Sequence, residues 1–586
     1  MTGRTARFLL SIAVFAVAAA LFAPSIAPTH LGLDDWGYTY GCPFVKDGLS
    51  LANVASAFST FGHGGIWMPL TSITYMADVS LFGAGWTAHH AVNVALHALT
   101  AAVLFNLLVA LLARLLPEVR KSHLLVCALA TLFWACNPER AEAVAWIASR
   151  KEELWSLLAL LGVASWVRHI EKGGRLHCFL TLGLFILACL AKPTAVCFPL
   201  LAAAAEIFIA GSRPRIVRYI PMLAVALVVG VIAFATQMHP EGMDYVELYT
   251  APFWWRLLNA AVATGVYILH AFVPYGVYTD WREIAGGWPL WSAPALATLS
   301  IAIAAFAFAM RRASDARLKR TLLFAAAWFA ISLLPVLGIF GSTGDKALAP
   351  RYTYLPAMAF AALLAYGVAS ISRRHLRFAA CLLLVLFVAV EAAISLPVTR
   401  SYKNDQTMAA RTLAFDGDNW RALRTVGRDL ATRQGRMDEG IAMIRRSLEM
   451  RPSQITVDTL AYLLACRGAD GDFAEVRRLA KPAATDHRLD KGGMLLDALG
   501  TVAMREGDWP SAVRFYSASI SAPNRSYPNL HTMLNLGLSL ANAGRDQEAA
   551  QVLRRLAATA QGGVRERAIE ALKTIEAGIS TRFEWK

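Results

Sequence analysis

Long apolar segments follow one another through the first two thirds of this chain and constrain its fold more than any other feature. They lie near residues 8–28, 88–115, 122–137, 152–169, 176–191, 194–210, 217–236, 256–276, 290–310, 321–340, 352–371 and 377–397. A helix needs about 20 apolar residues to cross the hydrocarbon core of a bilayer. Of the 586 residues 56% are hydrophobic and only 17% are charged. Residues 1–400 are therefore predicted to form an all-α, polytopic transmembrane domain, which excludes a soluble enzyme and a disordered chain.

The basic residues indicate how such a domain is oriented. Short loops rich in Lys and Arg stay in the cytoplasm, and such loops lie near 114–121, 168–175, 213–218, 311–320 and 373–377. These loops hold much of the net charge of +15, so the charge argues for a membrane and against nucleic acid as a partner. The short loops and compact length suggest a bacterial inner membrane.

Alternation from a cytoplasmic N-terminus, with 8–28 as an uncleaved first span, predicts which loops lie outside. The long first loop 29–87, the loop 138–151, the turn at Lys192 and the C-terminal region fall on the extracytoplasmic, periplasmic side. The alternation fails once, because the basic loop 311–320 would otherwise lie outside. One segment between 217 and 310 must be re-entrant or interfacial, or must hide an extra crossing. We expect an odd number of spans, about 11 to 13.

The C-terminal part has the composition of a soluble domain and a repeating pattern. After a linker at 401–418, residues 419–586 hold four predicted helix-turn-helix joints, each with a glycine: Gly435, Gly471, Gly507 and Gly544. The intervals of 36, 36 and 37 residues are close to the roughly 34 residues of a tetratricopeptide unit. An α-solenoid with a concave binding surface is therefore expected; the alternative is an irregular helical bundle.

Two adjacent carboxylates, Asp34 and Asp35, begin the first outside loop in the sequence LDDWGY. A carboxylate among apolar neighbours has a raised proton affinity and suits a general base. The alternative is a helix cap or a solvated loop start beside an interfacial aromatic belt.

The second span carries three polar residues on one helical face: His90, Asn93 and His97. Ionisable residues within membrane helices are candidates for function. No third metal ligand stands out, and the eight cysteines form no CxxC pair, so hydrogen bonds between helices are a better interpretation than zinc binding. A divalent cation on Asp34 and Asp35 stays open, and no cofactor is certain.

Cations also lie in the loops predicted outside, where the charge rule disfavours them. Arg150 lies near Glu142 and Glu152 in the second outside loop, Lys192 lies between two spans, and Arg351 with Tyr352 precedes a span. A phosphate bound at the membrane surface would explain these positions. The alternative for each residue alone is a snorkelling side chain at the interface.

Taken in order, these motifs resemble those of a known enzyme family. LDDWGY, HHAVNVALHAL, NPERAEAVAWIASRKEEL, LAKPTAVCFPL, YTDWRE and APRYTYLP resemble the GT-C fold glycosyltransferases with C-terminal tetratricopeptide repeats, the TMTC-type protein O-mannosyltransferase-like family. The resemblance covers essentially the whole chain.

The resemblance implies transfer of a sugar from a polyprenyl-phosphate carrier to an acceptor hydroxyl outside the cytoplasm. It implies Asp34 or Asp35 near the acceptor, and Arg150, Lys192 and Arg351 on the lipid phosphate. His90, Asn93 and His97 match the second-span face, and YTDWRE adds Asp280 to the candidates. The expected acceptor is a protein Ser/Thr or a glycan. A membrane transporter and a repeat scaffold of the cell envelope are the alternatives.

Overall fold

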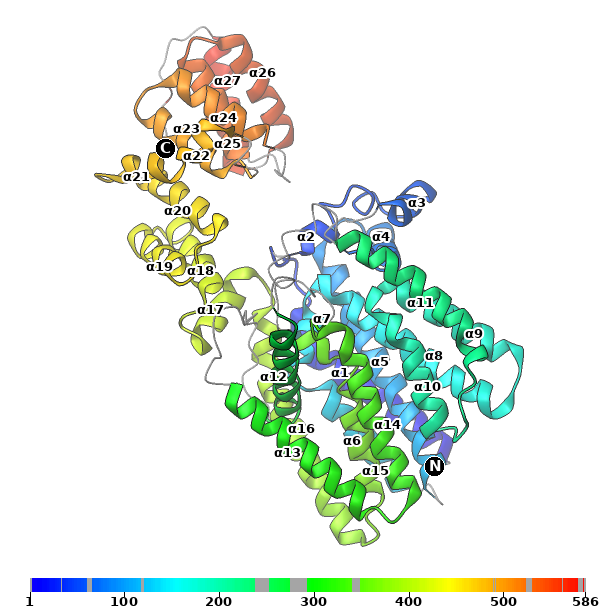
Figure 1. Cartoon of the computed structure of the whole chain (residues 1–586). Coiled ribbons are helices and arrows are strands. Elements are labelled where there is room, and N and C mark those ends of the chain that lie inside the picture. The colour runs from blue at the N-terminus through cyan, green and yellow to red at the C-terminus, as the bar shows by residue number, and fades with distance from the viewer. Residues whose placement is uncertain are drawn as a thin grey trace. The chain divides into compact units, whose positions relative to one another are not determined.

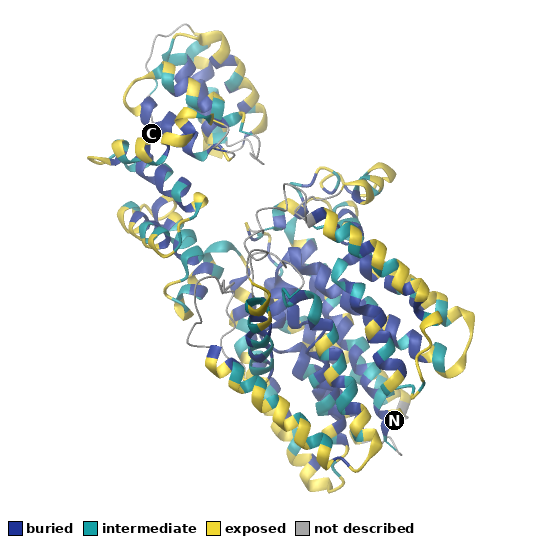
Figure 2. Ribbon diagram, in the orientation of Figure 1, coloured by how far each residue is buried: buried dark blue, intermediate teal, exposed yellow. Residues whose placement is uncertain are grey.

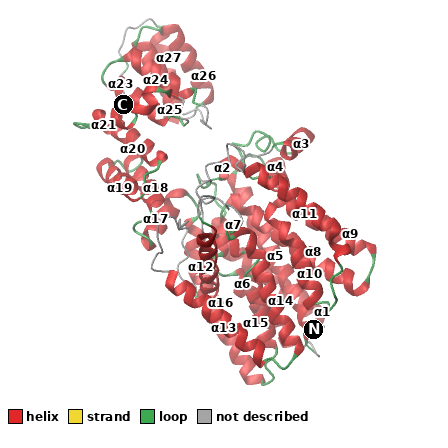
Figure 3. Cartoon of the chain, in the orientation of Figure 1, coloured by secondary structure: helices red, strands yellow, loops and turns green. Residues whose placement is uncertain are grey.

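The computed structural model describes residues 3–32, 34–60, 66–116, 121–237, 252–273, 292–339, 348–487, 490, 492–522, 530–560, 562–577 and 583. The chain forms two compact units, Met1–Met408 and Ala409–Lys586. Every regular element within these described ranges is a helix, with no strand among them (Figure 3). The predicted all-α fold class is confirmed for this part of the chain.

Each predicted apolar segment coincides with a helix of the first unit (Figure 1). These helices are α1 (Gly3–Phe22), α5 (Trp86–Leu115), α6 (Lys121–Ala135), α8 (Arg150–Lys172), α9 (Arg175–Ala191), α10 (Phe198–Phe208), α11 (Ile216–Gln237), α12 (Phe253–Phe272), α13 (Ser292–Arg312), α14 (Ala316–Leu333), α15 (Met358–Ala369) and α16 (Arg374–Ser401). Within the described ranges, six helices are long and apolar enough to cross a membrane: α1, α5, α11, α13, α14 and α16. That the unit spans a membrane with about 11 to 13 crossings stays a prediction.

The bundle has two chemically different ends. At one, called the basic end, Arg114 pairs with Glu171 at 2.7 Å, and the Arg317 guanidinium donates to the Leu115 carbonyl at 3.3 Å. At the other, called the site end, the Arg351 guanidinium pairs with Glu142 at 2.5 Å. Helices such as α5 and α8 run from the site end to the basic end, as the charge pattern predicts.

Helices α11, α12 and α13 lie in the part of the chain where the predicted alternation breaks. Helix α11 begins at the basic end, where Arg218 pairs with Glu206 at 2.8 Å. Helix α13 ends at the basic end, and its first turn lies against the C-terminal half of α12, where the Ala295 backbone packs on Gly265. His270 in the last turn of α12 lies 3.1 Å from Glu139 at the site end. The segments that join these three helices, residues 238–251 and 274–291, lie outside the described residues, so which segment breaks the alternation stays a prediction.

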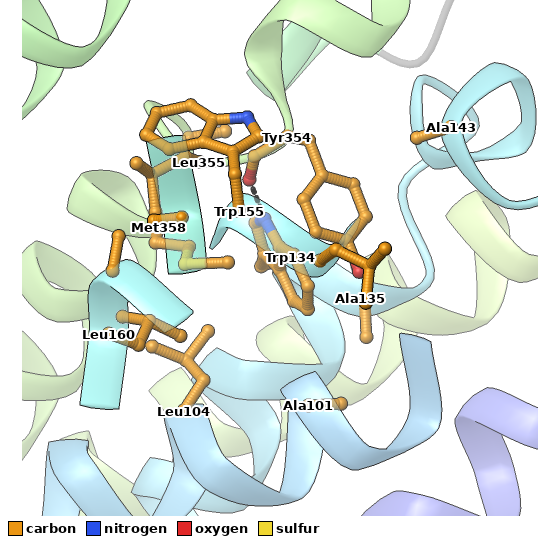
Figure 4. Packing of buried hydrophobic residues seen from close by; sticks show 14 of the residues in the cluster. Ala101, Leu104, Trp134, Ala135, Ala143, Trp155, Leu160, Tyr354, Leu355 and Met358 are labelled. Atoms are coloured by element: carbon orange, nitrogen blue, oxygen red, sulfur yellow. Dashed lines mark hydrogen bonds between the residues drawn. The ribbon is translucent and has the colours of Figure 1, made fainter. Parts of the chain in front are cut away.

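Exposed residues lie along the outer helices of the bundle (Figure 2), and large apolar side chains are among them. Leu227 on α11, Ile301 on α13 and Leu383 on α16 are each 68 or 69% exposed. Inside, aromatic residues pack among small ones, as around Trp134, whose indole N–H donates to the Tyr354 carbonyl at 2.9 Å (Figure 4). Burial of apolar surface inside explains the packing, and the apolar outer surface is typical of a protein in lipid.

The long first loop folds against the site end. It contains α2 (Asp35–Tyr38), α3 (Leu51–Ser59) and α4 (Pro69–Phe82). The Thr71 hydroxyl on α4 donates to the Ala191 carbonyl at 2.9 Å, next to Lys192. Short 3-10 turns complete this end: η3 (Ile147–Ser149) after α7 (Arg140–Ala145), η4 (Pro193–Cys197) and η7 (Pro350–Thr353).

The second unit is a series of paired helices. They are α18 (Trp420–Thr432), α19 (Met437–Met450), α20 (Gln454–Arg467), α21 (Asp472–Leu479), α22 (Lys481–Thr485), α23 (Met494–Arg505), α24 (Trp509–Ile520), α25 (Leu530–Asn542), α26 (Asp546–Thr559) and α27 (Gly562–Glu576). The four predicted joint glycines lie between helices with φ of 70–85°, which L side chains rarely adopt. The predicted helix-turn-helix joints are confirmed. Helix α17 (Asp405–Phe415) occupies most of the predicted linker 401–418.

Candidate functional site

The loop predicted at 138–151 is buried along its whole length and forms α7, η3 and the start of α8. A buried loop needs partners for its backbone groups. The Tyr75 hydroxyl donates to the Ile147 carbonyl at 2.7 Å, and the Asn93 amide donates to the Trp146 carbonyl at 3.2 Å. An Asp35 oxygen accepts the Ala148 N–H at 2.8 Å. Side chains of α2, α4 and α5 thus hold this loop in place.

Arg150 is part of the same support. Its side chain is 0% exposed and pairs with Asp78 at 2.6 Å. It also donates to the Asn93 side chain at 2.7 Å and to the His89 carbonyl at 2.8 Å. We call Asp35, Asp78, Asn93 and Arg150 the buried brace. Because protein groups already occupy these donors, Arg150 has little capacity left for a ligand.

Asp35 is also occupied by the protein. Its second oxygen accepts the Leu31 N–H at 2.9 Å, so both oxygens receive backbone donors. Burial raises the pKa of Asp35 to about 7, although the two backbone hydrogen bonds oppose that shift. The carboxylate therefore ties the first loop to η3.

A second group of ionisable residues lies at the same end of the bundle. We call Lys151, Lys192 and Arg351 the cationic cluster; they come from α8, from the turn after α9 and from η7. They are 6–8% exposed, whereas Arg150 and Asp35 are 0% exposed. Lys192 pairs with Glu152, and Arg351 pairs with Glu142. The Lys151 ammonium donates to the Ala148 carbonyl at 2.7 Å, which uses one of its three donors.

The charges of this cluster act on one another and on Asp34. Burial lowers the pKa of Lys151 to about 8; Asp34 and Glu152 oppose this shift, while Arg351 and Lys192 reinforce it. Burial also lowers the pKa of Lys192, despite its pairing with Glu152. Burial by itself would lower the pKa of Arg351, but the Glu142 carboxylate raises it above its usual range. Asp34 and the three cations therefore share one electrostatic environment.

Aromatic rings line the cationic cluster. The Lys151 ammonium lies 4.7 Å from the centre of the Tyr38 ring, and the Arg351 guanidinium lies 4.8 Å from that of Tyr352. The Lys192 ammonium lies 5.3 Å from the same Tyr352 ring. Such contacts favour the cation and leave hydrogen-bond donors for an anion.

Asp34 differs from its neighbour Asp35 in exposure and bonding. It is half-buried and occupies the residue before α2, but its side chain makes no cap hydrogen bond. Asp34 therefore occupies the position of a capping residue but does not make the capping hydrogen bond. A half-buried carboxylate whose charge acts on Lys151 and Arg351 is the better candidate for contact with a ligand.

The structure brings half of the predicted residues together. Residues at the cationic cluster are Asp34, Glu142, Glu152, Lys192, Arg351 and Tyr352. Residues in the buried brace are Asp35, Asn93 and Arg150. Asp280 lies outside the described residues.

The two histidines on the face of α5 make hydrogen bonds inside the bundle. His97 lies 2.9 Å from the Tyr354 hydroxyl and 3.2 Å from the Ala135 carbonyl. His90 lies 3.0 Å from the Thr29 carbonyl. These contacts agree with the interpretation as hydrogen bonds between chain segments.

The site residues chosen from the sequence did not include Lys151, Asp78 or Tyr38. Lys151 directly follows Arg150, and consecutive residues on a helix point about 100° apart. One of the two cations therefore faces the brace while the next faces the cluster. The helical periodicity of α8 could have suggested that Arg150 and Lys151 point in different directions, but not which of them belongs to the brace and which to the cluster.

No group of three or more His, Cys, Asp or Glu residues that could hold a metal ion occurs in the described ranges. Asp34 and Asp35 were the candidates for a divalent cation. Since both Asp35 oxygens accept backbone N–H groups, this pair offers a cation one carboxylate rather than two.

Comparison with known proteins does not assign this chain to a family. No protein-family model matches the sequence, and no curated protein matches it. Four chains of solved structures match. One is the crystal structure of the yeast Tom70, with 12% identity and a TM-score of 0.21 over 82% of this chain and 96% of that chain. A TM-score this low carries no argument about fold or function.

Proposed function

We propose that this protein is an integral-membrane glycosyltransferase that moves a sugar from a polyprenyl-phosphate carrier to an acceptor hydroxyl. One observation carries the proposal. Asp34, Lys151, Lys192 and Arg351 come from four separate segments of the chain and converge at one end of an apolar helical bundle. A carboxylate beside several cations suits a hydroxyl nucleophile and a phosphate leaving group.

The cations are proposed to bind the lipid phosphate. In the reaction, the bond between the anomeric carbon and the phosphate oxygen breaks, and its electron pair leaves with the lipid phosphate. Lys151, Lys192 and Arg351 would stabilise the charge that develops there. Their spare N–H groups are the donors for this role, while Glu142 and Glu152 hold two of the cations in position.

Asp34 is proposed as the general base. The acceptor oxygen attacks the anomeric carbon, and the hydroxyl proton passes to the Asp34 carboxylate as the new carbon–oxygen bond forms. Attack opposite the departing phosphate inverts the anomeric centre. Asp35 is less suited, because both of its oxygens already accept backbone N–H groups. No step requires a metal ion, although a divalent cation beside Asp34 stays a prediction.

The membrane supplies the donor. Apolar residues such as Leu227, Ile301 and Leu383 cover the bundle, and the positive charges of its basic end favour the cytoplasmic side. The site end would then lie outside the cytoplasm, in the periplasm if the protein belongs to a bacterial inner membrane. The helical pairs of the second unit, proposed as tetratricopeptide repeats, would bind the acceptor protein or a partner.

A transfer assay tests the proposal. Purified protein in detergent or lipid nanodiscs is incubated with a panel of polyprenyl-phosphate sugars and a Ser/Thr-rich peptide library, and products are identified by mass spectrometry. We expect a peptide heavier by one hexose, and a rate about 10²- to 10⁴-fold lower in Asp34→Asn. Asp47→Asn is the matched control, since Asp47 is an exposed carboxylate of the same loop.

The outcomes separate the alternatives. Transfer by the wild type that is unchanged in Asp34→Asn would refute the base assignment. Absence of transfer with every donor, combined with uptake of a solute in proteoliposomes, would refute the enzyme and favour a transporter.

A further inference from the structure

An apolar groove lies between α5, α8, α10, α14 and α15, separate from the cationic cluster. Its cavity volume is about 130 Å³, and its lining includes Leu104, Leu108, Leu160, Val163, Phe324 and Met358. Figure 4 shows Leu104, Leu160 and Met358 approaching one another from three different helices. A cavity with this lining favours a hydrocarbon chain over water.

Two arginines line the same groove near the basic end. Arg114 is held by two hydrogen bonds to Glu171, at 2.7 and 2.8 Å. Arg168, one turn before Glu171 on α8, also lines the groove, and its side chain is exposed. One carboxylate therefore faces two guanidinium groups, which leaves an excess of positive charge where the apolar lining ends.

The arginines lie far from the cationic cluster. Asn93 in the buried brace and Arg114 are 21 residues apart on the continuous helix α5, which corresponds to about 32 Å at 1.5 Å per residue. The hydrocarbon core of a bilayer is about 30 Å thick. If the bundle spans a membrane, the two sites lie in opposite leaflets.

We propose that this groove binds one anionic membrane phospholipid, with an acyl chain in the apolar part and its phosphate on Arg114 and Arg168. The separation argues against the sugar donor, whose phosphate belongs at Lys151, Lys192 and Arg351 in the other leaflet. A guanidinium group donates in a geometry that matches phosphate oxygens. The groove is thus a second lipid site, distinct from the proposed active site, although it shares the assumption that the unit lies in a membrane.

Native mass spectrometry combined with lipid extraction tests this inference. Purified full-length protein should retain one phospholipid per chain after detergent exchange. Its melting temperature should rise more with phosphatidylglycerol vesicles than with phosphatidylcholine vesicles. The double variant Arg114→Gln/Arg168→Gln should bind phosphatidylglycerol more weakly than the wild type, by about tenfold or more. Ala359→Phe should reduce retention by filling the groove, since Ala359 lines it.

Arg311→Gln is the matched control, because Arg311 is an exposed arginine at the C-terminal end of α13 and is not among the lining residues. The inference is overturned if the wild type retains no phospholipid or a polyprenyl lipid instead. It is also overturned if the double variant binds phosphatidylglycerol as tightly as Arg311→Gln does. Transfer activity measured on the same samples distinguishes this failure from failure of the proposed enzyme.

Discussion

The buried brace and the cationic cluster contain the same kinds of residue a few positions apart in sequence, yet the protein uses them differently. In the brace, Arg150 and Asp35 are 0% exposed, and Arg150 pairs with Asp78. In the cluster, Lys151 and Lys192 keep a small exposed area and spare donors. The brace stabilises a buried loop, and the cluster can bind an anion.

The difference teaches that the bonds already made by a charged group decide its role. Asp34 and Asp35 are neighbours, as are Arg150 and Lys151, and in each pair one member is occupied by the protein. Removing one member of a fully paired buried charge leaves its partner uncompensated and destabilises the fold. A charge with donors or acceptors left over is a candidate for chemistry.

Removing the central cation of the brace should have the largest effect. Arg150→Gln leaves the Asp78 carboxylate buried beside fewer donors, so we expect the free energy of unfolding to fall by about 3–5 kcal/mol. Thermal unfolding in detergent measures it. Arg311→Gln is the control, because Arg311 is an exposed residue at the C-terminal end of α13 and its substitution should change the free energy of unfolding by about 0.5 kcal/mol or less. Equal stability of the two variants would contradict the brace.

Removing a cation of the cluster should affect the donor rather than the fold. Lys151→Gln deletes a charged donor, and we expect the affinity for a polyprenyl-phosphate sugar to fall about 10- to 100-fold. Isothermal titration with wild type and variant measures it. An unchanged affinity would remove Lys151 from the phosphate site.

The Asp35 carboxylate should contribute a smaller amount of stability. In Asp35→Asn, a side-chain amide replaces one acceptor, so either Leu31 N–H or Ala148 N–H loses its partner. We expect the free energy of unfolding to fall by about 1–3 kcal/mol, with Asp34→Asn as the matched control that leaves it unchanged. If Asp35→Asn abolishes transfer while stability is unaltered, the roles of the two carboxylates are reversed.

Donor binding should also depend on pH. Burial lowers the pKa of Lys151 from 10.5 to about 8, so the free protein loses this cation as pH rises through 8. Affinity should then fall by up to about tenfold per pH unit. Because the unfolded chain keeps its proton up to the higher pKa, the destabilising cost of the buried Lys151 charge is relieved progressively between pH 8 and 10.5, so the free energy of unfolding rises in that window. Weaker binding in that window is therefore not unfolding. Lys151→Arg should reduce the dependence, and Lys192, whose pKa burial also lowers, should keep part of it; a pH-independent wild type would contradict the prediction.

Much of the fold could be predicted because its signals are local. Apolar runs such as 88–115 and 377–397 correspond to α5 and α16, and glycines such as Gly507, with φ of 80°, mark turns between helices. The position of the C-terminal end of α12 could not be predicted, because it depends on the contact between His270 and Glu139, 131 residues apart in the sequence.

The candidate site was predictable in its members but not in their roles. The excess of cations in loops expected outside singled out Lys192 and Arg351, which both lie in the cationic cluster. The family resemblance selected Arg150 instead of Lys151. Which of two adjacent residues faces Asp78 depends on the packing of α4 against α8, and that information is not local in the sequence.

A structure of the protein with a bound polyprenyl phosphate, determined by electron cryomicroscopy in a nanodisc, tests the central claim most directly. We expect the phosphate within hydrogen-bond distance of Lys151, Lys192 and Arg351, with Asp34 facing the side where the sugar attaches. A phosphate bound at Arg114 and Arg168, or at no protein cation, would contradict the account.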